Sequence, residues 1–248
     1  NAKMAKEMIE QNKMQKEVEI VGEIQKSLLS SNKKESFPLA GINIPAKVVS
    51  GDFYNFNDLG DGKYGCGVAD VSGKGIKSSL LMSKASSLYS CLSKTNFSPG
   101  NLLTQLNNEI CETISRGMFV TMLIGIYDSN SNELLLANAG HEPPIIMDKD
   151  NNFSNFEEAG PPLGIVKKTE YKEYKLNFEK SSMYIFTDGI TEIKNPEGNE
   201  LGSKGFQNYI TRFKDKPNNE RLKLIIDKVL DSKYIKKDDL TIVALDSK

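Results

Sequence analysis

The sequence predicts an α+β fold in which antiparallel sheets are covered by helices. Short β-rich runs alternate with segments of helical periodicity, and 248 residues suit one domain with an extension. Neighbouring runs are separated by only a few Gly, Asn, Asp or Ser residues, as at 60–62 and 128–132, which favours hairpins over a doubly wound parallel sheet. We therefore expect at least one large sheet and favour two.

The first element is a long helix at residues 2–31. This segment has no Pro, a single Gly and many Lys, Glu, Gln, Met and Ile, which favours helix over about eight turns. With the first Met at heptad position a, the seam is weakly apolar and reads Met4, Glu7, Gln11, Met14, Val18, Val21, Gln25 and Leu28. A helix packed on its own domain and a dimerising or signal-carrying helix fit this seam equally well. With a break at 30–38, we divide the chain into a linker helix at 1–32 and a domain at 33–248.

The remaining elements follow from periodicity and turn signals. Runs of β-rich composition predict strands at 42–49, 52–57, 64–71, 119–128, 133–137, 171–176, 183–187 and 240–245. Apolar residues at helical spacing predict helices at 76–92, 100–115, 204–213 and 219–230.

Composition excludes several classes of protein. The 32 Lys and Arg nearly balance the 33 Asp and Glu, which argues against a nucleic-acid partner. The longest apolar run, at 118–127, is too short to span a membrane.

Three cysteines, Cys66, Cys91 and Cys111, lie among apolar residues and predict buried free thiols in a reducing, cytoplasmic compartment. Because the chain begins with Asn, we expect a piece of a longer protein whose missing part lies upstream, and membrane tethering of that protein stays open.

Acidic residues stand where apolar strands meet Gly-rich or polar turns. Four aspartates share this placement: Asp52, Asp70, Asp188 and Asp238. Any one of them alone is more typical of a turn former. Together they form a set of hard oxygen donors that suits Mg²⁺ or Mn²⁺ rather than zinc. Two such ions can share a carboxylate and activate water for in-line displacement at phosphorus, which is phosphatase chemistry.

Three rival interpretations of nearby motifs are weaker. The stretch 67–75 has one residue too many for a nucleotide-binding P-loop, and Gly75 replaces the required Ser or Thr. The turn that begins at Asp58 lacks the twelfth-position Glu of a calcium loop, because Ala69 stands there. The single histidine, His141, has no nucleophile motif beside it, and a role in fixing a turn is favoured over acid–base catalysis.

In their order along the chain, these motifs resemble the SpoIIE-type and RsbU-like serine phosphatases of the metal-dependent (type 2C, PPM) superfamily. The matching pieces are Glu-Ile-Gln-Lys-Ser-Leu-Leu at 23–29, Val-Ser-Gly-Asp-Phe-Tyr at 49–54, Asp-Val-Ser-Gly-Lys-Gly at 70–75, Phe-Val-Thr at 119–121, Asn-Ala-Gly-His-Glu-Pro-Pro at 138–144, Gly-Pro-Pro-Leu-Gly at 160–164, Thr-Asp-Gly at 187–189 and Asp-Asp-Leu-Thr at 238–241. The resemblance covers nearly the whole chain.

The resemblance implies an αββα sandwich with two Mn²⁺ or Mg²⁺ ions bound at one edge between the sheets. By matching position the implied ligands are Asp52, Asp70, Asp188, Asp238 and the carbonyl of Val71. Among these, Asp70 would bridge the ions, and Asp70 and Asp188 are the implied catalytic residues. Asp239 stands where relatives have Asp or Asn, so it would either support its neighbour or replace Asp238 as the ligand.

Two family features are missing from this sequence. No His follows Asp70, and no Arg upstream of Asp52 is placed to grip a phosphate, so the general acid is unassigned. Lys74 could assist electrostatically or simply be solvated, and the two readings carry equal weight.

The resemblance also implies partners. Relatives dephosphorylate phosphoserine or phosphothreonine in a small protein, often a STAS-type anti-sigma-factor antagonist of bacterial partner switching, under control of an upstream sensor. The helix at 2–31 would then transmit the signal and hold a homodimer. Two alternatives stay open: a catalytically silent module that binds a phosphoprotein or scaffolds a dimer, and a hydrolase of small phosphate esters, which needs a deeper basic pocket.

Overall fold

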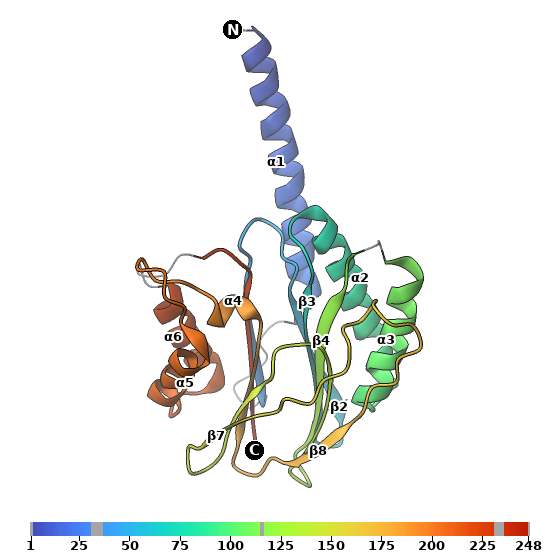
Figure 1. Cartoon of the computed structure of the whole chain (residues 1–248), viewed down its shortest axis with the longest axis vertical. Helices are drawn as coiled ribbons and strands as arrows, with labels where there is room; N and C mark the ends of the chain where they lie inside the picture. The colour runs from blue at the N-terminus through green and yellow to red at the C-terminus, as the bar shows by residue number, and fades with distance from the viewer. Residues whose placement is uncertain (1, 31–36, 115–116, 231–235, 248) are drawn as a thin grey trace.

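Two antiparallel sheets form the centre of the protein in the computed structural model, which describes residues 2–30, 37–114, 117–230 and 236–247. Helices α2 (Ile76–Leu92) and α3 (Pro99–Thr113) cover one sheet, and α5 (Gly202–Phe213) and α6 (Asn218–Leu230) cover the other (Figure 1). The predicted α+β fold and the implied sandwich are therefore confirmed.

Within the described residues, each sheet has five strands. The sheet under α2 and α3 has the order β2-β3-β4-β5-β8, built from Phe53–Gly60, Lys63–Val71, Val120–Asp128, Glu133–Ala139 and Tyr174–Asn177. The sheet under α5 and α6 has the order β1-β10-β9-β6-β7, built from Leu39–Ile44, Leu240–Asp246, Ser182–Phe186, Ile145–Met147 and Phe153–Asn155.

The central strands bury both of their faces. Along β4, Met122 and Ile124 belong to the core under α2 and α3, while Leu123 and Tyr127 belong to the core between the sheets. Successive side chains of a strand point to opposite faces, so a strand covered on both sides needs apolar residues at nearly every position. This explains why β4 reads as a continuous apolar run rather than as an alternating pattern.

The predicted elements differ from the observed ones mainly at their ends. Helix α3 begins after Ser98, whose hydroxyl accepts the N–H of Asn101, and Pro99 occupies its first turn, as helix starts favour. The strand predicted at 42–49 ends at Ile44, because Pro45 has no N–H to continue the ladder. Strands β6 and β7 were not predicted, since three residues are too few to show a period.

Helix α1 (Ala2–Leu28) stands away from the sandwich over its first half (Figure 1). Met4 and Met14 are 66% and 68% exposed, whereas Val18, Val21 and Leu28 further along the same seam are partly covered by the domain. The seam thus divides into a covered half and an exposed half. The predicted break at 30–38 falls largely outside the described residues. No helix in the described ranges, α1 included, is long and apolar enough to cross a membrane.

The three cysteines are free but not equally buried. Cys66 lies in the core between the sheets, and burial raises the pKa of its thiol to about 12. Cys91 is exposed and Cys111 is partly exposed, so the prediction of three buried thiols is wrong for Cys91. Both lie on helices, where an apolar neighbour in sequence can lie on a different face of the helix.

Candidate metal centre

Strand ends bring the four predicted aspartates to the same end of the sandwich. Asp52 directly precedes β2 and Asp70 is next to last in β3, and the pairing of Phe53 with Ala69 sets these strand ends side by side. In the other sheet, Asp188 follows the end of β9 and opens the short helix α4 (Asp188–Thr191), while Asp238 lies two residues before β10, which pairs with β9. Each sheet thus contributes one pair of neighbouring strand ends, and each pair supplies two of the four side chains.

Asp52 is fixed by two threonines of the opposite sheet. It is 2% exposed, and its Oδ2 accepts hydrogen bonds from the hydroxyls of Thr187 at 2.8 Å and Thr241 at 2.6 Å. Two donors on one oxygen orient the carboxyl and leave Oδ1 for another partner. Both threonines lie inside the motifs Thr-Asp-Gly and Asp-Asp-Leu-Thr, yet sequence reasoning gave them no role. The sequence did offer one signal for such a role, because both threonines lie in motifs that contain a predicted ligand.

Crowding makes it costly for these aspartates to be charged together. Burial and the charge of Asp70 raise the pKa of Asp52 well above its usual value. Burial and Asp188 raise the pKa of Asp70 to about 6, although a hydrogen bond with Asp52 lowers it in part. Burial and Asp238 likewise raise the pKa of Asp188. Carboxyls that repel one another in a partly buried site are the arrangement that a divalent cation relieves.

The oxygen donors suit a hard divalent ion, although the candidate side chains do not converge closely enough to coordinate one. Asp70 and Asp188 line an open hollow of about 250 Å³ together with Thr121 and Glu142. Within the described ranges, no three acidic, His or Cys side chains come close enough to form a ready-made metal site. All the candidate donors are oxygens, which Mg²⁺ and Mn²⁺ prefer. The carboxyls would have to draw together to hold an ion.

Asp239 does not line this hollow, and its side chain holds a loop. Its Oδ1 accepts the N–H of Ala46 at 2.6 Å, and its Oδ2 accepts the N–H of Gly51 at 2.7 Å and the hydroxyl of Ser50 at 2.9 Å. A Cβ at Gly51 would lie 3.2 Å from the carbonyl oxygen of Val71, the predicted backbone ligand, which is a tight contact. These bonds favour the supporting role for Asp239 over replacement of Asp238.

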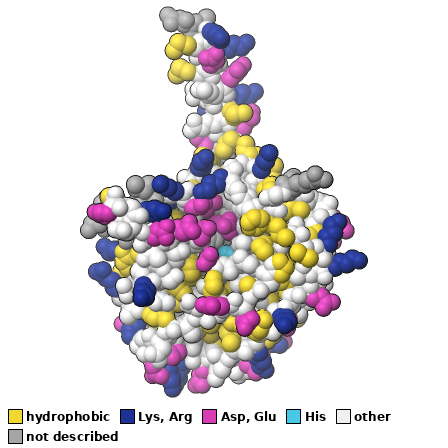
Figure 2. Space-filling view, viewed as in Figure 1, with side chains coloured by type: hydrophobic (Ala, Val, Ile, Leu, Met, Phe, Trp, Pro, Cys, Tyr) yellow, Lys and Arg dark blue, Asp and Glu magenta, His cyan; other side chains and the backbone are white. Residues whose placement is uncertain are grey.

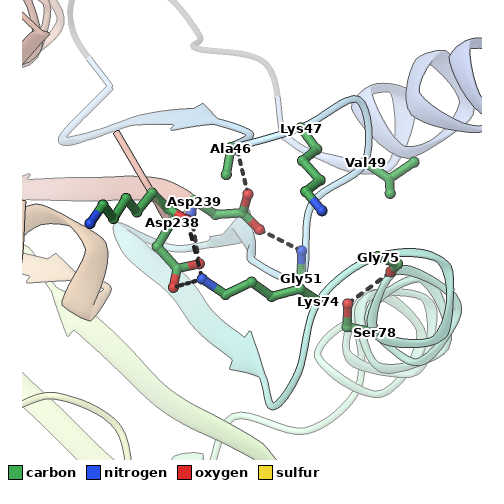
Figure 3. A pocket seen from close by; sticks show the side chains of 10 residues that line it. Ala46, Lys47, Val49, Gly51, Lys74, Gly75, Ser78, Asp238 and Asp239 are labelled. Atoms are coloured by element: carbon green, nitrogen blue, oxygen red, sulfur yellow. Dashed lines mark hydrogen bonds and ion pairs between the residues drawn. The ribbon is translucent and has the colours of Figure 1, made fainter. Parts of the chain in front are cut away.

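Lys74 has a partner that neither sequence interpretation foresaw. Its Nζ lies 2.6 Å from Oδ2 of Asp238, as an ion pair that crosses from the loop after β3 to the turn before β10 (Figure 3). The pair is partly exposed, with Lys74 at 54% and Asp238 at 42% side-chain exposure.

His141 serves the turn after β5. Asn138 accepts the N–H of His141 at 2.8 Å and donates to its carbonyl at 3.0 Å, while the ring Nδ1 lies 3.0 Å from the hydroxyl of Thr121. The ring is buried, and burial lowers its pKa to about 4. A neutral, anchored imidazole agrees with the turn-fixing role.

The surface around the hollow is acidic. Figure 2 shows Asp and Glu side chains gathered across the face of the sandwich just below α1. Glu142 and Glu192 add negative charge to that of the four aspartates. Burial, Asp188 and Glu192 together raise the pKa of Glu142. This concentration of negative charge attracts cations to this end of the molecule.

Sequence comparison identifies relatives of the chain. The model of the family "Stage II sporulation protein E (SpoIIE)" matches residues 60–248. Phosphoserine phosphatase RsbU of Bacillus subtilis (strain 168) is 32% identical over 240 residues, which is 95% of this chain and 71% of RsbU. Phosphoserine phosphatase RsbP of the same organism is 22% identical over 183 residues, but the chain spans only 45% of RsbP.

Solved structures share the fold. The SiaA-PP2C domain of Pseudomonas aeruginosa superposes with a TM-score of 0.82 at 19% identity, covering 96% of this chain and 98% of that one. The RsbU and RsbW domains of Rv1364c from Mycobacterium tuberculosis give 0.72 at 20% identity, covering 88% and 64%. RsbX in complex with magnesium gives 0.61 at 18% identity, covering 85% and 94%. With the family match over most of its length, the chain belongs to the SpoIIE family of PP2C-type serine phosphatases.

Proposed function

We propose that this chain is a protein phosphatase that hydrolyses phosphoserine or phosphothreonine. The observation that carries the proposal is the convergence of Asp52, Asp70, Asp188 and Asp238 at one end of a SpoIIE-family sandwich. In the reaction, the oxygen of water forms a bond to phosphorus, the bond from phosphorus to the serine oxygen breaks, and that oxygen takes up a proton. The products are serine and inorganic phosphate.

The aspartates would divide the work of holding two Mn²⁺ or Mg²⁺ ions. Asp70 lines the hollow beside Asp188, and its strand end is paired with the strand end that Asp52 precedes, so it is placed to be shared between two ions. Asp52, Asp188, Asp238 and the Val71 carbonyl would complete the set. Bound ions would supply the positive charge that activates water and offsets charge developing on the phosphate. The similarity to RsbU and the magnesium in the RsbX structure support this assignment.

A substrate comparison tests the reaction class. We expect Mn²⁺-dependent phosphate release from a folded phosphoserine protein of the STAS type and slower release from a nucleotide, because the hollow of about 250 Å³ is open and acidic. Asp188→Asn should lower the rate by at least about 100-fold, whereas Asp150→Asn, an exposed aspartate in the turn between β6 and β7, should leave it unchanged.

Either of two results would contradict the proposal. Faster turnover of the nucleotide would favour a small-ester hydrolase. Absence of turnover at saturating Mn²⁺, with phosphoprotein still bound, would favour a silent binding module. The choice of a STAS-type phosphoprotein rests on the similarity to RsbU and on the RsbU and RsbW domains that occur together in Rv1364c.

For the N-terminal helix, we infer a second copy of this chain as the partner. Residues 1–32 form the linker in this proposal and 33–248 the phosphatase domain. Met4 and Met14, on the exposed half of the seam, are the proposed contacts, and apolar side chains so exposed on a projecting helix favour helix pairing.

Lysine substitutions on α1 test the dimer. Met4→Lys with Met14→Lys should shift the chain from dimer to monomer in light scattering, because buried charges oppose helix pairing. Ile9→Lys is the matched control, since five positions turn the helix by about 140° away from Met4. If the helix also transmits a signal, the monomeric variant should release phosphate at a changed rate. Unchanged mass together with an unchanged rate would contradict both roles.

A further inference from the structure

The loop Ser72-Gly73-Lys74-Gly75 is shaped to carry one side chain across the candidate site. Gly73 has φ 89° and Gly75 has φ 87°, conformations that residues with a side chain rarely adopt. Between these two bends, Lys74 reaches a partner 164 positions away in sequence.

The ammonium of Lys74 occupies a cation position on Asp238. Its Nζ donates to Oδ2 of Asp238 at 2.6 Å and to the carbonyl oxygen of Lys237 at 3.1 Å, so backbone and side chain both hold it (Figure 3). The other oxygen of Asp238, Oδ1, accepts the N–H of Asp239 at 3.0 Å. Both carboxylate oxygens of Asp238 are therefore engaged by the chain itself.

A divalent ion and this ammonium would compete for the same oxygen. A carboxylate oxygen that already accepts a charged N–H offers a metal less electron density, and two cations held within a few ångströms repel each other. Because Lys74 and Asp238 are 54% and 42% exposed, the pair is weak enough to be displaced.

We propose that Lys74 is an internal counter-ion that competes with divalent metal for Asp238 and so weakens metal binding at that part of the centre. The inference rests on the proposed function, because it takes Asp238 as a metal ligand. Metal binding then requires Lys74 to leave Asp238, and the site fills only at metal concentrations high enough to displace it.

Calorimetric titration with Mn²⁺ of the full chain tests this without reference to turnover. Lys74→Met removes the charge and keeps most of the side-chain length, and it should tighten Mn²⁺ binding by about three- to fivefold. Lys74→Arg keeps the charge and should stay within about twofold of the wild type. Lys77→Met changes net charge equally at an exposed position three residues further on and should also stay within about twofold.

Each other outcome counts against the inference. Equal or weaker binding by Lys74→Met, with thermal unfolding in a chelator like that of the wild type, would overturn the competition and leave the phosphatase proposal standing. The same tightening in Lys77→Met would reduce the effect to net charge and overturn it too. Absence of Mn²⁺ binding in both the wild type and Lys74→Met would overturn both the inference and the proposed metal centre.

Discussion

Replacing Asp70 by Asn is expected to abolish metal-dependent phosphate release while making the metal-free protein more stable. Asp70 is the proposed shared ligand, so its loss should lower the rate by about 1,000-fold or more. In the absence of metal, a charged Asp70 destabilises the folded protein, because burial and Asp188 raise the pKa of Asp70 to about 6. The neutral amide removes that destabilising charge.

The pH dependence of this gain follows from the sign of the pKa change. A carboxyl whose pKa is higher in the folded state binds more protons there than in the unfolded state, so its contribution to stability falls as pH rises from about 4 to about 6. At pH 7 in a chelator, we expect urea unfolding of Asp70→Asn to show a gain of about 1–3 kcal/mol. At pH 4 the gain should largely disappear. A variant less stable than the wild type at pH 7 would contradict the account.

Replacing Gly189 by Ala is expected to damage both the fold and the site. A Cβ at this position would lie 2.0 Å from the carbonyl oxygen of Asp239, which is backbone and cannot rotate away. The turn before β10 would have to move away from α4, and Asp188 would separate from Asp238. We expect a loss of about 1–3 kcal/mol in urea unfolding and a fall of about 100-fold in phosphate release at saturating Mn²⁺.

A second glycine provides the control for this substitution. Gly65 lies in β3, and a Cβ there would come no closer than 3.5 Å to a neighbouring atom, Leu59 Cδ1, which is ordinary van der Waals contact. Gly65→Ala should therefore retain activity and most of its stability. If Gly189→Ala behaved like Gly65→Ala, the close packing of α4 against the start of β10 would not be what positions Asp188.

The fold class and the position of the four aspartates at strand ends could be predicted from the sequence because both have local signals. An aspartate at the junction of an apolar strand and a Gly-rich turn is visible in a few residues, as with Asp70 and Asp188. The strands and long helices were visible from their periodicity, whereas β6 and β7 were too short to show one.

What the sequence could not predict is mostly pairing between distant segments. The bond from Thr187 to Asp52 spans 135 positions, and the pair between Lys74 and Asp238 spans 164. Gln25 was assigned to a heptad seam, yet it is buried against its own domain, accepting the N–H of Ser50 at 3.0 Å and donating to the carbonyl of Ser79 at 3.0 Å. Such contacts depend on how the sheets and helices stack, which no local pattern specifies.

In the proposed mechanism, the crowded carboxyls at the end of the sandwich form one centre for two ions. Counting bound Mn²⁺ by electron paramagnetic resonance, in wild type and in Asp70→Asn, tests it most directly. We expect two magnetically coupled ions per wild-type chain. In Asp70→Asn we expect the coupling and at least one ion to be lost. Equal numbers of bound ions with the same spectrum in both proteins would contradict it.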